Sequence, residues 1–188
     1  HYPATNRVVR IIYIDIDTLR ADHLGCGGYH RNTSPNIDNV ASAGINFRNV
    51  YASDVPCLPS RTALITGMFG IRNGVINHGG RAADLQPEGK DRGFFGRFSM
   101  RSWASVFYLA GWHTASISSV PFRHGASWWN SGFMESMNLM RGFGGERADQ
   151  VIPGALDWLE RRGKADDWFL HVHLWDPHTP YRTPEDYG

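Results

Sequence analysis

Runs of apolar residues that alternate with helical patterns give the first outline of this chain. Residues 8–17 (VVRIIYIDID) are almost continuously apolar and end in acids. Such a run is typical of a strand that is buried on both faces of a parallel sheet. Similar apolar runs predict further strands at residues 45–51, 113–119 and 168–175.

Start and stop signals for helices lie between these runs. Ser34 stands at an N-cap position, Pro35 follows at the first helical position, and Gly44 comes just after the last residue of the pattern. Because proline fits the first turn and glycine the end of a helix, these signals predict a helix over residues 35–43. Comparable patterns predict helices over residues 60–67, 100–111 and 147–163.

Two of these helices carry a more detailed expectation. Ser60 is expected to cap the helix over residues 60–67, and Pro153 is expected either to kink the last helix or to delay its start. Residues 78–98 are rich in glycine and charge, which predicts a long loop. Since strand and helix patterns alternate, we expect an α/β fold in which helices sandwich a mostly parallel sheet.

Composition narrows the class of protein without naming a function. The 188 residues are 41% hydrophobic and 20% charged, and their formal net charge is +1. These values are ordinary for a soluble globular chain and give no reason to expect a nucleic-acid or membrane-surface partner. No apolar run approaches the length of a membrane span, and the N-terminus lacks a signal-peptide pattern. Location is left open, and secretion or periplasmic export after signal removal is compatible with the sequence.

Residues able to do chemistry follow three of the predicted strands. Asp17 ends the first strand, Cys57 follows the second, and His178 follows the last. Ligands of open α/β sheets collect beyond the carboxyl ends of the strands. We therefore expect these three side chains to contribute to a site there.

Two acids end the first strand. Asp15 and Asp17 are two residues apart, so their side chains point to the same side of a strand. Two such carboxylates repel unless a cation lies between them, and hard divalent cations take oxygen ligands of this kind. Metal binding at Asp17 is one interpretation; the alternative is that Asp17 only caps the segment that follows.

Cys57 lies close to the start of a predicted helix, with Arg61 four residues further on. An anion there would meet unpaired backbone N–H groups and the positive end of the helix. Arg61 would add a bidentate guanidinium. The alternative is a small buried cysteine in a tight turn. Cys26, the other cysteine, lies in LGCGGYH and has no comparable flank.

The stretch CLPSR, residues 57–61, matches the sulfatase pattern Cys-x-Pro-Ser-Arg. Its surroundings agree, because IDTLRADHLGCGGY, TSPNIDNVASAGINFRNVYA, PSRTALITGM and WDPHTPY resemble segments of sulfatases in the same order. The resemblance covers residues 8–80 closely and the remainder in patches. By this resemblance, residues 1–188 are the N-terminal part of a sulfatase catalytic domain with an alkaline-phosphatase-like fold.

The resemblance implies a nucleophile that is made after translation. In sulfatases a formylglycine-generating enzyme oxidises this cysteine to formylglycine (3-oxoalanine), whose aldehyde is hydrated to a diol. One hydroxyl attacks sulfur and the other then expels sulfate, which is covalent catalysis with its own release step. A divalent metal, expected to be calcium, stabilises the developing charge. The implied substrate is an organic sulfate ester, of a carbohydrate or an aryl alcohol.

The resemblance also implies roles for individual residues. Cys57 is the catalytic nucleophile and, once modified, a metal ligand. Asp17 matches the first metal ligand of the family. Arg61 matches the arginine that holds the nucleophile and its charge. His178 matches a histidine near the sulfate and the leaving oxygen.

Two departures from the family pattern leave positions open. Thr18 stands where many sulfatases have a second aspartate, so the second metal ligand is either Asp15 or Thr18. A Lys-x-His motif is missing after residues 113–119, where Ser119 occupies the region. His124 is the nearest candidate for the motif's catalytic histidine, and Arg123 beside it would supply a cation.

Further histidines and a pair of tryptophans have structural interpretations, and some of them could also contribute to the site. His171 and His173 alternate along a buried strand and are expected to be hydrogen-bonded core histidines. His78 either lines the site or caps a turn. Trp128 and Trp129 either stack on a sugar ring or pack in the core.

Rival functions remain beside sulfate ester hydrolysis. The first is hydrolysis of phosphonate or phosphate esters by an enzyme of the same superfamily, and the second is binding of sulfated glycans by a decayed site. We also expect an incomplete active site in these residues. The family's remaining metal ligands, an Asp-Asn or Asp-His pair, lie downstream of the WDPHTPY segment, and WFLHVHLW leaves no later strand to cover its neighbour's edge.

Overall fold

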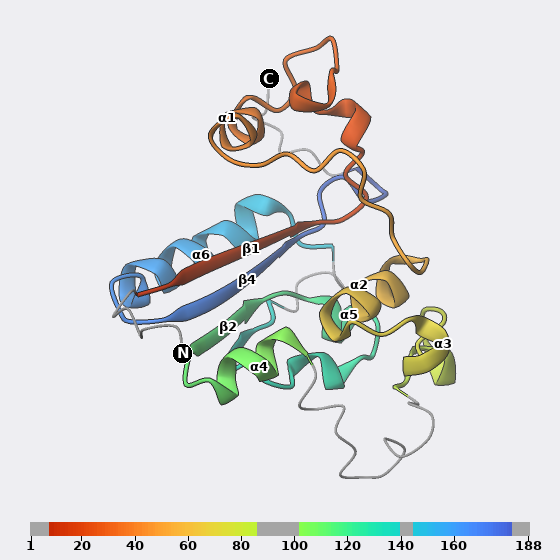
Figure 1. The fold of residues 1–188 in the computed structure, drawn as a ribbon. Coiled ribbons are helices and arrows are strands. Elements are labelled where there is room, and N and C mark those ends of the chain that lie inside the picture. The colour runs from red at the N-terminus through yellow and green to blue at the C-terminus, as the bar shows by residue number, and fades with distance from the viewer. Residues whose placement is uncertain (1–7, 86–101, 140–144, 182–188) are drawn as a thin grey trace, which may run out of the picture. The chain divides into compact units, whose positions relative to one another are not determined.

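The computed structural model describes residues 8–85, 102–139 and 145–181 (Figure 1). The chain divides into two compact units, one formed by His1–Asp17 with Ser53–Gly188 and the other by Thr18–Ala52. Each unit is described by itself. None of the described helices combines the length and the apolarity that crossing a membrane requires.

A parallel sheet forms the centre of the larger unit. Its strands, in spatial order, are β1 (Arg10–Ile16), β4 (Trp168–Leu174), β2 (His113–Ile117) and β3 (Glu135–Met137). The predicted α/β class with a parallel sheet is therefore confirmed. Strands β1, β2 and β4 lie where the apolar runs predict them. Strand β3 has three residues, too few for a periodic pattern to reveal it.

The helices of this unit are α2 (Cys57–Thr66), α3 (Gly70–Asn73), α4 (Trp103–Leu109), α5 (Val120–Arg123) and α6 (Ala148–Arg162). Helices α2, α4 and α6 correspond to the predicted ones. Helix α6 begins at Ala148 and continues through Pro153, so its start is not delayed. The predicted loop over residues 78–98 contains a 3₁₀ turn at Gly80–Ala83, and its residues from 86 onward lie outside the described residues.

Two clusters of buried side chains hold the sheet and helices together. Helix α6 covers one face of the sheet (Figure 1), and its cluster consists of Ala115, Ile117, Val151, Ala155, Trp158, Trp168, Leu170 and Val172. The second cluster joins α2 and α5 to the end of β4 and consists of Leu58, Val75, Ala83, Val120, Ala126, Trp129 and Trp175. Trp129 thus packs in the core rather than facing solvent.

Strand β1 is an edge strand. Ile12 and Ile14 are 48% and 56% exposed, although they pair in register with Leu170 and Val172. Helix α6 covers Leu170 and Val172, and this cover ends before β1. The prediction that residues 8–17 are buried on both faces is therefore wrong within the described residues. Among the same residues, the outer edge of β1 has no strand partner.

The smaller unit contains helix α1 (Pro35–Ala43) and 3₁₀ turns at Ala21–His23 and Gly25–Gly27. Helix α1 begins and ends where Pro35 and Gly44 predict. The Ser34 hydroxyl donates to the Asp38 carboxylate at 3.0 Å, and the Cys26 N–H donates to it at 2.7 Å. Asp38 therefore connects the 3₁₀ turn that contains Cys26 to helix α1, so the backbone of Cys26 has a structural role.

The strand predicted at residues 45–51 is not present. These residues form no ladder, and their apolar side chains are exposed. A strand needs a hydrogen-bonded neighbour as well as an apolar sequence, and no described segment pairs with this one. The apolar run alone was insufficient evidence for a strand.

Candidate active site

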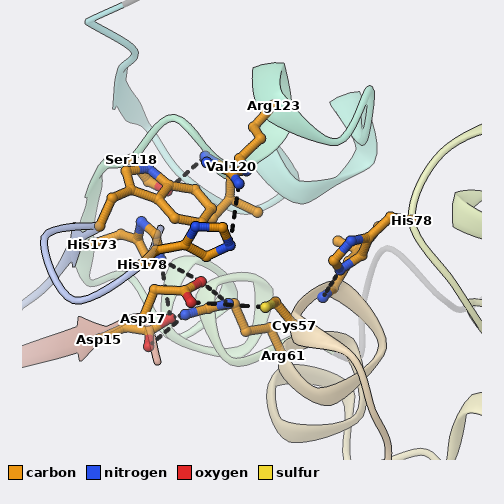
Figure 2. Close-up of polar contacts among 12 residues, drawn as sticks. Asp15, Asp17, Cys57, Arg61, His78, Ser118, Val120, Arg123, His173 and His178 are labelled. Atoms are coloured by element: carbon orange, nitrogen blue, oxygen red, sulfur yellow. Dashed lines mark hydrogen bonds and ion pairs between the residues drawn. The ribbon is translucent and has the colours of Figure 1, made fainter. Parts of the chain in front are cut away.

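Three side chains that the sequence singles out meet at one end of the sheet. Asp17 follows β1, Cys57 is the first residue of α2, and His178 lies in the turn after β4. The Cys57 Sγ is 3.7 Å from the Asp17 Oδ1, and one ligand atom from each of the three residues lies within 4.8 Å of the others. Figure 2 shows this arrangement, in which Asp17 and His178 follow strands of the sheet as expected, whereas Cys57 is placed by the start of α2.

The start of α2 sets the position of Cys57. Helix α2 begins at Cys57 and not at Ser60, so the prediction that Ser60 caps it is wrong. Leu58, the next residue, is fully buried in the core and anchors this first turn. The Leu58 N–H donates to Nε2 of His78 at 3.2 Å, which satisfies one of the unpaired donors at the helix start. His78 thus has a capping role beside the site.

Arg61 lies one helical turn after Cys57 and faces two acids. Its Nη1 donates to Oδ2 of Asp17 at 2.9 Å, and its Nε and Nη2 donate to the two carboxylate oxygens of Asp15. Burial by itself would lower the pKa of Arg61, but the bond and charge of Asp15 and the charge of Asp17 outweigh it and raise that pKa. Arg61 is therefore a fixed cation next to Cys57.

Asp15 holds Arg61 in this structure. Both of its oxygens accept from the guanidinium in a fork, the geometry that makes such pairs strong and specific. The sequence pattern indicates a metal-ligand role for Asp15 and gives no sign of this contact with Arg61. The choice of second metal ligand between Asp15 and Thr18 stays a prediction.

The environment of Cys57 keeps its thiol protonated. Partial burial raises the pKa of Cys57, the Asp17 carboxylate raises it further, and the Arg61 guanidinium lowers it by less. A thiolate is the nucleophilic form of cysteine. An unmodified Cys57 is therefore a weak nucleophile at neutral pH, even though it lies at a helix start beside an arginine.

His178 has a defined hydrogen-bonding state. Its Nδ1 lies 2.7 Å from the carbonyl oxygen of Thr179, and its Nε2 lies 3.2 Å from Nη2 of Arg123. A guanidinium has only donors, so Nε2 accepts and Nδ1 carries the proton. Arg123 and Thr179 thus set the tautomer of His178.

His124 lies beside His78 and not against Cys57. The ring centroids of His124 and His78 are 4.5 Å apart, and those of His124 and Trp175 are 6.1 Å apart. Burial, together with the nearby His78 and Arg123, lowers the pKa of His124 to about 3. A catalytic role of His124 stays a prediction.

The two histidines of β4 are core residues, as predicted, but only one is hydrogen-bonded among the described residues. Nδ1 of His171 lies 3.0 Å from the Ser116 hydroxyl. Neither ring nitrogen of His173 has a hydrogen-bond partner there; its Nε2 is 3.9 Å from Asp15 and 4.0 Å from Asp17. His173 is therefore a buried residue that lies next to the carboxylates of Asp15 and Asp17.

We expect acid to destabilise the folded protein through its buried histidines. Burial lowers the pKa of His171 from 6.5 to about 4, and that of His124 to about 3. Since the unfolded chain then takes up protons first, stability that is present above pH 6.5 is lost as the pH falls toward 4. Each histidine contributes up to about 1.4 kcal/mol per pH unit.

Urea unfolding at several pH values between 7 and 4.5 checks this expectation. The unfolding free energy should fall with pH, and His171→Phe should flatten the slope. Phe169→Leu, at a buried ring that does not titrate, serves as the control; it should lower the stability and leave the slope unchanged. A slope in His171→Phe as steep as in the parent protein would contradict the assignment.

Comparisons with known proteins agree with the geometry. The family model Sulfatase matches residues 10–188. The uncharacterized sulfatase YidJ of Escherichia coli (strain K12) is 23% identical over 203 residues, which span 94% of this chain and 40% of YidJ. The chain therefore spans about two fifths of the length of this relative.

Solved structures share the fold. BT4656, in complex with its substrate D-glucosamine-2-N,6-O-disulfate, has a TM-score of 0.69 at 21% identity, covering 94% of this chain and 36% of BT4656. The phosphonate monoester hydrolase of Agrobacterium radiobacter has a TM-score of 0.63 at 18% identity, covering 94% and 42%. At these identities the likeness shows the fold alone, which includes enzymes that act on different esters.

Proposed function

The chain belongs to the sulfatase family, and from this premise we propose that it carries the nucleophile of an enzyme that hydrolyses organic sulfate esters. The observation that carries the proposal is the cluster at the start of α2. Cys57 lies 3.7 Å from the buried Asp17, and Arg61 contacts that same carboxylate at 2.9 Å. A nucleophile, an acid and a fixed cation are what transfer of an anionic group from an alcohol requires.

We propose that residue 57 acts as formylglycine, produced by a formylglycine-generating enzyme. The raised pKa of Cys57 supports this, because a plain thiol at this position is mostly protonated at neutral pH. A hydrated formylglycine would supply one hydroxyl for attack and a second for release of sulfate. Arg61 keeps a guanidinium beside residue 57, held there by Asp15 and Asp17, whichever side chain residue 57 carries.

The donor set at the site fits a divalent cation in part. Asp17 is 1% exposed and offers a carboxylate, and Cys57 and His178 point to the same place. With formylglycine at position 57, Asp17 and residue 57 would give the oxygen ligands that calcium prefers. Bound there, the cation would stabilise negative charge on the substrate.

We expect Asp17→Asn to lower the divalent-metal content of the complete protein. Replacing a carboxylate by an amide removes the negative charge that attracts a hard cation. Elemental analysis after dialysis measures the effect, which should be a loss of most of the bound calcium. Asp22→Asn, at an exposed acid, is the control. Equal metal content in the Asp17→Asn variant and the parent would contradict the assignment.

His178 is proposed to serve the leaving alcohol. Its Nε2 accepts a hydrogen bond from Arg123, and one of its ring nitrogens lies within 4.8 Å of ligand atoms of Asp17 and Cys57. We propose that in the reacting complex Nε2 carries a proton in place of this bond and gives it to the oxygen of the leaving alcohol. His124 is proposed to support this side of the site through its contact with the His78 ring.

Hydrolysis of phosphonate or phosphate esters is the second candidate. A specific observation favours keeping it, namely the fold shared with a phosphonate monoester hydrolase. Turnover of nitrophenyl sulfate, phosphate and phenylphosphonate by the complete protein separates the two. We expect the sulfate to react at least about tenfold faster. A faster reaction with phosphate or phosphonate would overturn the assignment. A protein that binds sulfated sugars without turnover would indicate the glycan-binding alternative.

The substrate alcohol is proposed to be a sugar or an aryl group. The sugar sulfate bound by BT4656 supports this only by likeness of fold. A panel of sulfated monosaccharides and aryl sulfates, with desulfation followed by release of sulfate, tests it. Turnover confined to alkyl sulfates would contradict it.

We propose that further polypeptide completes the site. Only three metal-ligating groups gather among the described residues, whereas calcium takes about six to eight oxygens. Residues 1–188 alone should therefore be inactive and poorly soluble, because Ile12 and Ile14 stay exposed on an edge strand. Expression of residues 1–188 beside the complete gene product measures this. A monomeric fragment that turns over sulfate esters would refute it.

A further inference from the structure

One aromatic ring lies among the charged and titratable side chains of the site. The guanidinium carbon of Arg123 is 4.3 Å from the centroid of the Trp175 ring, and that of Arg61 is 5.9 Å away. The ring of His173 meets Trp175 edge-on at 4.1 Å, and that of His178 does so at 5.9 Å. With the His124 ring 6.1 Å away, Trp175 therefore has contacts with both guanidinium groups and three histidines.

A buried chain of hydrogen bonds fixes the plane of this ring. The Trp175 Nε1–H donates to the Ser119 hydroxyl at 2.7 Å, and that hydroxyl donates to Oε2 of Glu146 at 2.7 Å. Trp175, Ser119 and Glu146 are only 3%, 5% and 2% exposed. They come from the end of β4, the start of α5 and the segment before α6. A hydroxyl that accepts one bond and donates the other leaves the indole one orientation.

The face of the ring in turn positions Arg123. A guanidinium that stacks on an indole makes the most favourable kind of cation–π contact. Because the guanidinium is planar, stacking also fixes where its N–H groups point. One of these groups reaches Nε2 of His178 at 3.2 Å (Figure 2). The orientation of His178 thus depends on Trp175 through Arg123.

We propose that Trp175, locked by Ser119 and Glu146, is a positioning residue that holds Arg123 against His178 and so fixes the His178 ring beside residue 57. Its kinetic consequence rests on the proposed function, since His178 is the group that serves the leaving alcohol there. The placement of Arg123 by Trp175 does not depend on the proposed function. A role for Trp175 in core packing alone would predict lower stability without a selective loss in kcat.

Kinetics of the complete protein with a sulfate ester test the proposal. Trp175→Leu removes the ring and should lower kcat about tenfold, while KM changes by less than about twofold. Trp175→Phe keeps an aromatic face and should recover most of the loss. Ser119→Ala frees the ring while keeping it, and should lower kcat about threefold. Arg123→Lys keeps the charge but not the planar fork, and should lower kcat about as much as Trp175→Leu.

A matched control separates positioning from packing. Trp158 is 2% exposed and belongs to the other core cluster, so Trp158→Leu removes an equally buried tryptophan away from the site. It should lower the melting temperature and leave kcat unchanged. The double variant Trp175→Leu with Arg123→Lys should be little worse than either single one, because both break the same contact. Additive losses, or no recovery in Trp175→Phe, would overturn the proposal.

Crystal structures give a readout that is independent of activity. In Trp175→Leu, and in Ser119→Ala if the first variant does not fold, the Arg123 guanidinium should leave Nε2 of His178. An unmoved guanidinium would overturn the proposal whatever the kinetics. If the parent protein hydrolyses no sulfate ester, the proposed function fails, and these structures still decide whether Trp175 positions Arg123.

Discussion

Replacing Cys57 by alanine should abolish sulfate ester hydrolysis. The side chain of residue 57 is the nucleophile that lies beside Asp17 at the start of α2, and Arg61 contacts the same carboxylate. Loss of a covalent nucleophile typically costs at least about a thousandfold in kcat. Turnover of nitrophenyl sulfate by the complete protein, produced together with a formylglycine-generating enzyme, measures the effect.

Cys26→Ala is the matched control for this experiment. Cys26 is also a free, partly exposed cysteine, but it lies in the smaller unit. There its backbone N–H donates a hydrogen bond to the Asp38 carboxylate. Activity should stay near that of the parent. Substantial turnover by Cys57→Ala, or its loss in Cys26→Ala, would contradict the assignment of the nucleophile.

Arg61→Ala should damage catalysis and stability together. It removes the cation beside residue 57, for which a loss of about a hundredfold or more in kcat is expected. It also leaves the acids Asp15 and Asp17 without their partner in a buried setting, where a broken pair costs about 3–5 kcal/mol. The sequence alone predicts damage mainly to catalysis, because Arg61 then counts as an anion-site residue and not as the partner of two buried acids.

The two effects of Arg61 can be measured separately. Urea unfolding gives the stability, and kcat at low denaturant gives the catalytic loss. Arg61→Ala combined with Asp15→Asn should recover part of the stability and none of the activity. Arg161→Ala, at an exposed ion pair with Asp157, is the control and should change neither. Normal turnover by folded Arg61→Ala would show that Arg61 is dispensable for the reaction.

Signals in the sequence predict well those helices and strands that are determined by residues close together along the chain. Helix α1 begins and ends at the proline and glycine that mark it, and β1, β2 and β4 lie on apolar runs. The error at residues 45–51 has the opposite cause. Strand formation depends on a neighbour from elsewhere in the chain, and an apolar pattern says nothing about whether that neighbour is present.

The meeting of Asp17 and His178 can be predicted because each follows a strand of the parallel sheet, and these strand ends share one edge. The place of Cys57 cannot be predicted in this way, because the strand expected before it is absent and the start of α2 positions it instead. The contact between Asp15 and Arg61 cannot be predicted in this way. It depends on the rotation of α2, which starts at Cys57 and not at Ser60, so that Arg61 faces β1.

The buried chain from Trp175 through Ser119 to Glu146 also has no signature in the sequence. Its members are separated by 56 and 27 residues, and none stands in a motif with the others. In the sequence, Ser119 stands out only because it occupies the region where many sulfatases have a Lys-x-His motif. Its role becomes visible once Trp175 and Val120, the residue after Ser119, pack in one core cluster.

The most direct test measures sulfate ester turnover as a function of the fraction of residue 57 that carries formylglycine. Peptide mass spectrometry gives that fraction in preparations made with different amounts of the formylglycine-generating enzyme. We predict that turnover is proportional to the converted fraction and extrapolates to zero when residue 57 is entirely cysteine. Full turnover by protein whose Cys57 is unconverted would contradict the proposed mechanism.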